Sequence, residues 1–436
     1  MSLLLSGFGA VILALVGPVQ AAEFERFTTD DGLRVLFMSA PEPAMVDIQL
    51  TFAAGAARDG ELEGLAALTA RALAHGAGEL DADALAEAFE GVGAQFSADA
   101  GRDMGVVSLR SLTEPDWLER ALQTLTTVLA EPRFPAADFE RSRRQTLRAI
   151  QREGQEPGSV ARRALWRSLY PDHPYGAMPV GRAETVEALT NEDAREFFER
   201  YYVRENAILT LVGAVDREQA EAIAERLSGA LRAGERAPAL PEPTVKAETQ
   251  RIAFPSTQAH LFVGMPLIRR DDPDYFELLV ANHILGGQSF NSRLFQDLRT
   301  RQGLAYSVFS VLQPLAVDGP FVAGMQTAAA QADHAERELL AAIDDWLENG
   351  VTEDEFAAAV DNLVNGFPLT IASNSAMVGQ LAAIGFYGLP DDWLDTWVER
   401  VRAVEREAMM ERLRERFRPD ALSLIVVGAT DGGLSE

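Results

Sequence analysis

The chain carries few of the side chains that most often bind transition metals or act as nucleophiles. It has no cysteine, which excludes disulfides, thiolate catalysis and cysteine-ligated metals. Its histidines are His75, His173, His260, His283 and His334. No two of them stand three or four residues apart, the spacing that places two metal ligands on one helix face. A self-contained zinc helix is therefore excluded, and no Gly-x-Ser-x-Gly segment indicates a serine nucleophile.

Composition indicates a large globular protein with an acidic surface. The 436 residues include 66 Asp and Glu against 39 Lys and Arg, a formal net charge of −27. With 47% hydrophobic and 24% charged residues, the chain can form two to four domains of about 100–200 residues each. Because phosphate binding requires grouped Lys and Arg, the charge argues against nucleic acid as a partner.

The N-terminal residues predict export. Residues 3–16 form an apolar run, and Val19-Gln20-Ala21 supplies the small residues that signal peptidase requires. We therefore expect a signal peptide over residues 1–21 and a periplasmic mature protein. No Lys or Arg precedes the run, which leaves open an uncleaved anchor or an incomplete start. The run is shorter than the roughly 20 residues that span a membrane, and no second such stretch follows, so we expect no stable membrane span.

The mature chain divides into two halves that resemble each other. Three prolines between residues 230 and 250 predict an extended linker between an N-terminal half, 22–229, and a C-terminal half, 251–436. Three features recur in the same order across this linker, 211, 215 and 217 residues apart. They pair Ala70–Gly76 with Ala281–Gly287, Ala207–Gly213 with Leu422–Gly428, and Phe139 with Phe356. The nearly constant offset indicates a duplicated unit.

Each half is expected to begin with strands and to contain a pair of helices later. The predicted strands include 33–37, 46–52, 106–110, 251–254, 260–264, 306–310 and 321–325. The predicted helix pairs are 116–129 with a helix from 135 onward, and 335–347 with a helix that a Thr352–Glu355 capping box begins. Because strands and helices do not strictly alternate, the order predicts an α+β fold in which each half is a mixed, largely antiparallel sheet packed with helices.

Five segments spread over most of the mature chain carry a family resemblance. They are GLRV at 32–35, GAARD at 55–59, GLA at 64–66, HPYG at 173–176 and GGQSFNSRLFQDLRTRQGLAYSV at 286–308. Together they resemble the insulinase/pitrilysin-type zinc metallopeptidases, especially mitochondrial processing peptidase and its bacterial two-subunit relatives. The resemblance implies that the chain forms half of a clam-shaped peptidase.

The resemblance also implies that a zinc site has been lost from the N-terminal half. The family's H-x-x-E-H signature and its distant third ligand correspond here to Ala67, Ala70, Arg71 and Arg148. Alanine offers no lone pair, and a protonated guanidinium repels a cation. We therefore expect no metal or other cofactor in this chain, and zinc in a partner subunit.

A substrate-binding pair has been kept in the C-terminal half, according to the same resemblance. The family's Arg and Tyr, seven residues apart, hold the substrate backbone and stabilise the oxyanion opposite the zinc, and they correspond to Arg299 and Tyr306. The simpler interpretation is a charge at a helix C-terminus and a half-buried strand aromatic. Because Gly303 interrupts the helix, we expect the pair to span a helix end, a turn and a strand start.

A second binding element is implied around residue 95. The segment 90–98 resembles the family's edge strand, which pairs with an extended substrate and includes the positions Gly93, Ala94, Gln95 and Phe96. From its residues alone, the segment is a glycine-containing β segment that could equally be structural.

These features lead to two main hypotheses. The first is a non-catalytic subunit of a heteromeric zinc metallopeptidase, inactive alone, which acts on peptides together with a homologous zinc-bearing subunit. The second is an inactive pseudo-peptidase that binds peptides or forms a structural scaffold, as a homodimer or bound to a membrane complex. A third, an autonomous hydrolase with a new site, has no supporting motif. The sequence identifies neither the substrate peptide nor the partner.

Overall fold

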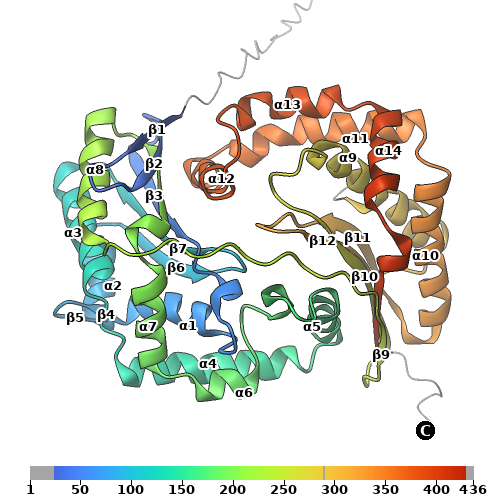
Figure 1. Cartoon of the computed structure of the whole chain (residues 1–436), viewed down its shortest axis with the longest axis horizontal. Coiled ribbons are helices and arrows are strands. Elements are labelled where there is room, and N and C mark those ends of the chain that lie inside the picture. Colours follow the sequence, from blue (N-terminus) through green and yellow to red (C-terminus); the bar gives the residue numbers. More distant parts are fainter. Residues whose placement is uncertain (1–23, 288–289, 429–436) are drawn as a thin grey trace, which may run out of the picture.

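The structure of the chain, a computed structural model, describes residues 24–287 and 290–428. Within them, two large β-sheets and the helices around them form two halves (Figure 1). The expected signal segment at 1–21 lies outside the described residues, so this assignment stays a prediction.

The N-terminal half contains a six-stranded sheet in the order β1-β2-β8-β3-β7-β6. Its strands are β1 (Glu25–Thr28), β2 (Arg34–Ser39), β3 (Met45–Phe52), β6 (Gln95–Ala100), β7 (Gly105–Leu112) and β8 (Ala207–Gly213). Its helices are α1 (Leu65–Ala72), α2 (Ala82–Glu90), α3 (Pro115–Ala130), α4 (Ala136–Glu153), α5 (Pro157–Leu169), α6 (Ala183–Ala188), α7 (Asn191–Tyr201) and α8 (Arg217–Ala230). The short strands β4 (Gly76–Ala77) and β5 (Leu80–Asp81) form a separate pair after α1.

The C-terminal half contains a five-stranded sheet in the order β11-β12-β10-β13-β9. Its strands are β9 (Thr249–Ile252), β10 (Gln258–Ile268), β11 (Ser307–Leu312), β12 (Gly319–Ala328) and β13 (Ser423–Val427). Its helices are α9 (Tyr275–Gly286), α10 (Ala332–Glu348), α11 (Glu353–Gly366), α12 (Asn374–Tyr387), α13 (Trp393–Ala403), α14 (Arg406–Arg416) and a π-helical segment, Phe295–Arg301. The predicted capping box is present at the start of α11, where Thr352 and Glu355 bond each other's backbone N–H groups.

The two sheets share one topology. Read from β6, the N-terminal order β6-β7-β3-β8-β2 matches β11-β12-β10-β13-β9, and β1 is an additional strand. In both sheets the fourth and fifth strands pair parallel and the other neighbours of this set pair antiparallel. The predicted α+β fold with two homologous halves is therefore confirmed.

Each half contributes one helix to the sheet of the other half. Helix α5 packs against β10 and β13, and α12 packs against β8 and β3 (Figure 1). This exchange explains why β8 is buried at every position: Leu209 and Leu211 join the core of the N-terminal half, whereas Ile208 joins the core that contains α12. The approach is close at Gly385 of α12, where a Cβ atom would lie 2.8 Å from a Leu36 methyl carbon. The two halves are thus interlocked.

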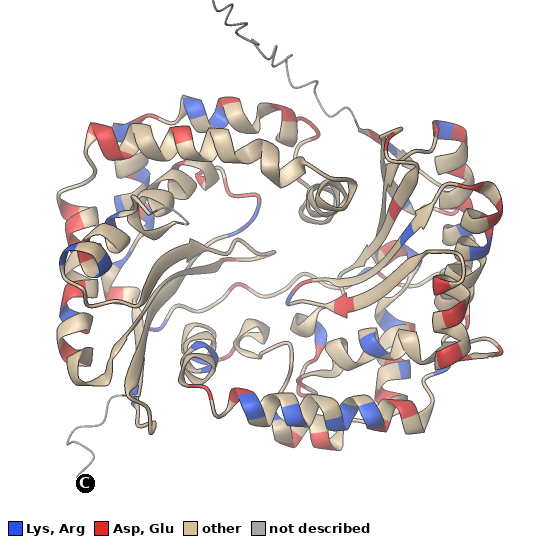
Figure 2. Cartoon of the chain, turned by 180° about the vertical axis from the view of Figure 1, so that it is seen from behind, with Lys and Arg blue, Asp and Glu red and all other residues tan. Residues whose placement is uncertain are grey.

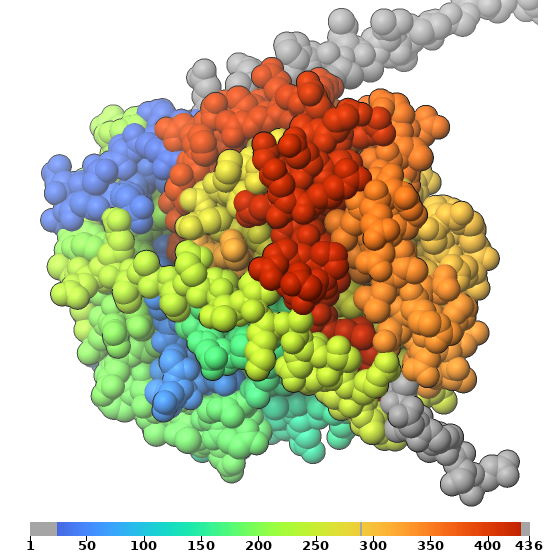
Figure 3. Space-filling model, turned by 45° about the vertical axis from the view of Figure 1, so that its right-hand side comes forward, coloured from blue at the N-terminus to red at the C-terminus, as the bar shows by residue number. Residues whose placement is uncertain are grey.

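The connection between the halves runs across the surface. Residues 231–248 contain no helix or extended strand and lie between the end of α8 and the start of β9. Figure 3 shows this segment in yellow-green, exposed below the red C-terminal helices. A connection without regular structure is what a proline-rich, polar segment favours.

Two local predictions were inaccurate. The β segment predicted from residue 90 begins only at Gln95, because Glu90 ends α2 and Gly93 turns the chain at a φ of +67°. Gly93 therefore lies in a turn, and Ala94 directly precedes the edge strand. The strand predicted over 251–254 is instead β9, two residues earlier. Strand ends depend on ladder pairing with distant residues, which local composition does not contain.

Within residues 24–287 and 290–428, no single helix is both long and apolar enough to cross a bilayer. The helices Glu353–Ile371 and Asn374–Tyr387, bent by 106° at the break between them, are together long and apolar enough by length and composition only.

Candidate functional site

Helix α1 begins at a glycine that a buried carboxylate supports. Gly64 precedes the helix at a φ of +99°, a conformation that other residues rarely adopt. Asp59 accepts hydrogen bonds from the backbone N–H of Gly64 at 2.7 Å and of Ala66 at 2.8 Å. Burial raises the pKa of the Asp59 carboxyl to about 7. The start of α1 is therefore fixed by groups outside the motif that would hold a metal.

The α1 positions that correspond to metal ligands offer no metal donors. Ala67 and Ala70 are buried in the protein, and Ala70 has an exposed fraction of 0%. Arg71 is exposed, and its Nη1 donates to the hydroxyl of Thr146 on α4 at 2.9 Å. Among the described residues, no group of three His, Cys, Asp or Glu side chains could hold a metal ion.

The residue that the motif alignment places at the third-ligand position is not the one that lies beside α1. Arg148 is exposed on α4, whereas Thr146, two residues earlier, is buried and is the residue that meets Arg71. Basic residues predominate along α4 (Figure 2), and Arg141, Arg143 and Arg144 pair with Asp138 or Glu140. The geometry therefore brings Thr146, not Arg148, to the α1 site, and the assignment of Arg148 stays a sequence prediction.

His75 lies next to this region without completing a metal site. It ends the 3₁₀ turn after α1, and its Nε2 is 3.0 Å from the Ser142 hydroxyl of α4. Burial lowers the pKa of His75, so its neutral form is favoured. The residue joins α1 to α4, as a helix-end histidine does.

The edge of the N-terminal sheet forms a small pocket. A cavity of about 310 Å³ lies between β6, α2 and the end of α1, and Ala94, Gln95 and Phe96 are among its lining residues. Phe96 stacks on Phe89 of α2 with ring centroids 4.9 Å apart. Gln95 is exposed and Phe96 half-buried, so the expected peptide-binding positions divide between solvent and pocket.

Arg299 and Tyr306 are held on either side of one tight turn. Arg299 belongs to the π-helical segment, and Gly303 reverses the chain at a φ of +65°. The N–H groups of Leu304 and Ala305 both donate to the carbonyl oxygen of Leu298, at 2.8 and 3.1 Å. Tyr306 immediately precedes β11 and donates its N–H to the β12 carbonyl of Gln326 at 2.8 Å. The pair therefore spans a helix end, a turn and a strand start.

Both side chains of the pair are available to a ligand. Arg299 is exposed, lies 4.9 Å from the Phe295 ring centroid and makes no ion pair with the described residues. Tyr306 has an exposed fraction of 59%. By contrast, Arg293 is half-buried and pairs with both Asp345 and Glu355. A free guanidinium and a free phenol are suitable donors to a carbonyl oxygen that gains charge.

A buried carboxylate that sequence reasoning missed joins the two halves. Asp103, in the β6–β7 turn, accepts from the Tyr175 hydroxyl at 2.5 Å, from the Tyr387 hydroxyl of α12 at 3.1 Å and from the Ala316 N–H at 3.0 Å. Burial, and then the Asp103 carboxylate, raise the pKa of both phenols, so both remain donors. Of these residues, the sequence indicated only Tyr175, because it lies in the HPYG motif.

The Asp103 contacts connect the tips of two equivalent hairpins. Ala316 lies in the β11–β12 connection, the counterpart of the β6–β7 turn. Beside Asp103, the Arg102 guanidinium stacks 3.6 Å from the Trp166 ring centroid and donates to the carbonyl oxygens of Tyr175 and Ala177. This cluster fixes the position of the β6 edge relative to the β11 edge.

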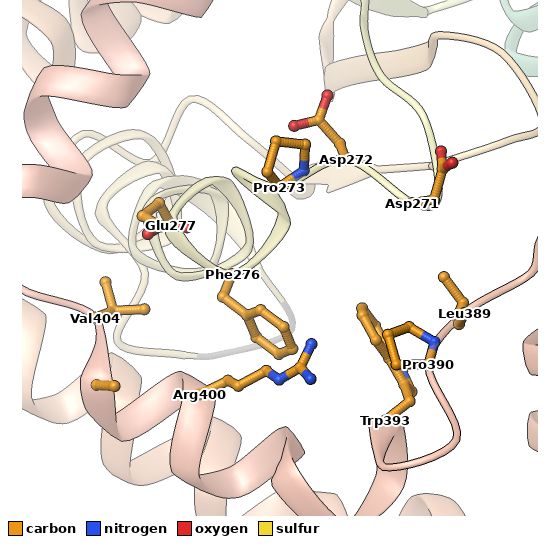
Figure 4. Close-up of a pocket in the computed structure, with 11 residues that line it drawn as sticks. Asp271, Asp272, Pro273, Phe276, Glu277, Leu389, Pro390, Trp393, Arg400 and Val404 are labelled. Atoms are coloured by element: carbon orange, nitrogen blue, oxygen red, sulfur yellow. The ribbon is translucent and has the colours of Figure 1, made fainter.

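A separate pocket lies outside the predicted site. It measures about 330 Å³ and is lined by residues of α9, α13 and their connections, none of them a predicted site residue. Figure 4 shows Arg400 beside Phe276 and Trp393, and Arg400 also bonds the Asp392 carboxylate at 3.1 Å. Because the Arg400 guanidinium is already paired with Asp392, it has few N–H groups left to donate to a ligand in this pocket, whose wall is mainly aromatic.

Two family models match the chain. The model described as "Insulinase (Peptidase family M16)" matches residues 34–180, and the one described as "Peptidase M16 inactive domain" matches residues 188–363. Together they reach into both halves, and they confirm the resemblance predicted from the motifs.

Individual relatives give the same result. The chain is 35% identical to a Pseudomonas fluorescens protein whose crystal structure is described as a peptidase M16 inactive domain, covering 94% of this chain and 98% of that one with a TM-score of 0.90. It is 23% identical to the Bacillus subtilis "Uncharacterized zinc protease YmxG", over 92% and 98% of the two chains. It is also 23% identical to the Helicobacter pylori "Non-peptidase homolog YmxG", over 87% and 88%.

Proposed function

The chain belongs to the insulinase (M16) peptidase family, and from that premise we propose that it is the non-catalytic, Arg/Tyr-bearing subunit of a heteromeric zinc metallopeptidase. A homologous subunit binds zinc and activates water, while Arg299 and Tyr306 bind the substrate backbone and stabilise the oxyanion. The complex processes or degrades peptides. The expected signal segment supports a periplasmic location.

The contrast between α1 and the 299–306 turn carries this proposal. At Ala67, Ala70 and Arg71, no side chain has a lone pair that could coordinate a metal ion. At Arg299 and Tyr306, it presents two exposed donors in a fixed geometry. Such donors stabilise a developing oxyanion only if another chain supplies the nucleophile, and this requirement supports a zinc-bearing partner.

The first experiment measures zinc in the native complex. The tagged chain is recovered gently from its own host, and zinc is quantified together with any co-purifying chain. We expect about one zinc per pair, together with a second chain of similar size. Zinc-free protein, alone or paired with itself, would instead support the pseudo-peptidase hypothesis.

A mutational test then assigns the two donors. In the complex, Arg299→Ala or Tyr306→Phe should lower peptide turnover by about 100-fold, the usual effect of removing one oxyanion donor, without releasing the partner. Arg301→Ala is the matched control, because Arg301 is also exposed but is ion-paired with Asp297. Unchanged kinetics in both test variants would defeat the assignment.

The alternative role is a peptide-binding or structural scaffold. The Helicobacter pylori relative is named as a non-peptidase homolog, which supports an inactive role for that protein. For this chain, the scaffold role predicts no zinc-bearing partner and no effect of Tyr306→Phe, so the two experiments above separate the alternatives.

A further inference from the structure

Exposed apolar side chains gather around one strand. Of the eight large hydrophobic residues that are most exposed among the described residues, four lie on β11 or beside it. They are Phe290, Tyr306, Phe309 and Val311, with exposed fractions of 77%, 59%, 38% and 40%. Native proteins seldom leave an apolar edge strand uncovered, because its free backbone groups pair with other chains. The surface formed by β11 and these residues, here called the β11 edge, therefore requires an occupant.

A cavity runs along this edge. It measures about 500 Å³ and is bounded by the end of α9, by Phe290 and Phe295, and by residues 308–311 of β11. Phe290 meets Phe295 edge-to-face, with ring centroids 5.2 Å apart, which forms an aromatic wall opposite the strand. The dimensions suit one large apolar side chain projecting from a backbone that lies against β11.

The strand presents an edge with a free side. Within the described residues, β11 pairs only with β12, from Ser307 opposite Gln326 to Leu312 opposite Phe321. Val308 and Leu312 contact the core, whereas Phe309 and Val311 lie on the more exposed side. The alternation turns one face of β11 to the core and the other to solvent, and the backbone edge away from β12 remains for pairing with an added strand.

Charge distinguishes this edge from the equivalent one in the other half. Residues 307–312 contain no charged side chain, and Figure 2 shows the C-terminal sheet largely without acidic or basic residues. On β6, by contrast, Asp99 is exposed, and Glu90 is among the residues that line its pocket. The β11 edge is therefore suited to an uncharged, apolar segment, whereas the β6 edge is more compatible with a basic one.

We propose that the β11 edge binds an extended peptide segment as an added strand, with one aromatic or large aliphatic side chain of the peptide in the Phe290–Phe295 cavity. A six-residue edge with four exposed side chains is small beside the roughly 1,200–2,000 Å² of a stable protein interface, which favours a peptide over a second copy of the chain. The inference deepens the proposed function, on which it rests, by naming the substrate class: uncharged segments with an apolar anchor.

The test measures peptide binding to the mature chain without any partner. The probe is a fluorescent, end-blocked ten-residue peptide of alternating Thr and Val with one central Phe, and its binding is followed by fluorescence anisotropy. We expect that replacing the central Phe by Ala weakens binding by about 10- to 100-fold, the effect of losing one buried aromatic side chain. Because the edge is uncharged, affinity should change little between 50 and 500 mM salt.

Two variants locate the site, and each has a matched control. Phe290→Ala should weaken the Phe peptide about 10-fold, whereas Trp117→Ala, which removes an aromatic residue with an exposed fraction of 44% from α3, should not. Val311→Lys should weaken every extended peptide, whereas Val245→Lys, at a similar exposure of 41%, should not. All four positions are exposed, so the variants are expected to fold, which circular dichroism verifies.

Three results would overturn the inference. One is equal binding of the Phe and Ala peptides, and another is equal affinity of Phe290→Ala and Trp117→Ala. The third is a dimer of the unchanged chain that Val311→Lys dissociates in sedimentation, which would make a second copy the occupant. The peptide-binding assay contains no partner, so the two proposals can fail separately. If the peptide does not bind, the turnover test at Arg299 and Tyr306 is unaffected. If no zinc-bearing partner exists, the peptide-binding result is unaffected.

Discussion

The two halves share one strand order but differ at the ends of their equivalent helices α1 and α9. After α1, the space beside β6 measures about 310 Å³ and is lined by the stacked rings of Phe89 and Phe96. After α9, the space beside β11 measures about 500 Å³ and is bounded by the exposed ring of Phe290. The fold is common to both, so the chemistry depends on the few side chains that the core does not need.

The same contrast applies to the carboxylates that precede the two helices. Asp59 supports the start of α1 and bonds only backbone N–H groups. Asp272, 213 residues later, holds the Asp274 N–H before α9 and also pairs with Arg416 at 2.5 Å. In one half the buried acid bonds only backbone N–H groups, whereas in the other half the buried acid is paired with an arginine.

The largest expected effect comes from rebuilding the lost metal site in the N-terminal half. The triple variant Ala67→His, Arg71→His and Thr146→Glu should bind zinc at least about 1,000-fold more tightly than the unchanged chain. The two α1 positions are four residues apart on one helix face, and Thr146 already contacts Arg71. Isothermal titration calorimetry measures the affinity and the stoichiometry.

A second triple variant serves as the comparison, with Arg148→Glu in place of Thr146→Glu. Because Arg148 is exposed on α4, this variant should bind zinc more weakly than the first. If it binds more tightly, the motif alignment identifies the third position correctly and the Thr146 contact does not.

An intermediate effect is expected where the halves meet. Asp103→Ala should lower the free energy of unfolding by about 4 kcal/mol, because two tyrosine hydroxyls and one backbone N–H lose their acceptor in a buried environment. Asp47→Ala, which breaks a partly exposed pair with Arg110 inside the N-terminal sheet, should cost about 1 kcal/mol. Urea denaturation measures both, and equal losses would argue against a special role for the junction between halves.

The sequence was sufficient to predict the features that recur in the two halves, but it was insufficient to predict the contacts between the halves. The duplication, the α+β class and the capping box at Thr352 follow from local patterns that recur along the chain, and the structure contains all three. The exchange of α5 and α12 has no local signal, because an apolar helix face is the same whichever sheet it covers. Asp103 is similar, since an acid in a turn indicates solvent exposure until Tyr387, 284 residues away, is placed beside it.

The sharpest comparison between the halves is the pH dependence of stability at Asp59. Because its folded pKa is about 7 and its unfolded pKa about 3.8, the folded chain keeps a proton that the unfolded chain releases between these values. Stability therefore falls as pH rises from about 4 to 7, by at most about 1.4 kcal/mol per pH unit, and is constant above that range. Asp59→Asn should remove this slope while losing one hydrogen bond at every pH.

Asp272→Asn is the matched variant in the C-terminal half. It deprives Arg416 of a buried partner, and its loss of stability is the reference against which the slope at Asp59 is compared. Urea unfolding at four pH values gives the difference from the unchanged chain for each variant. Parallel curves for Asp59→Asn and Asp272→Asn would contradict the argument, because the pH dependence could then not be assigned to the unpaired buried carboxyl of Asp59.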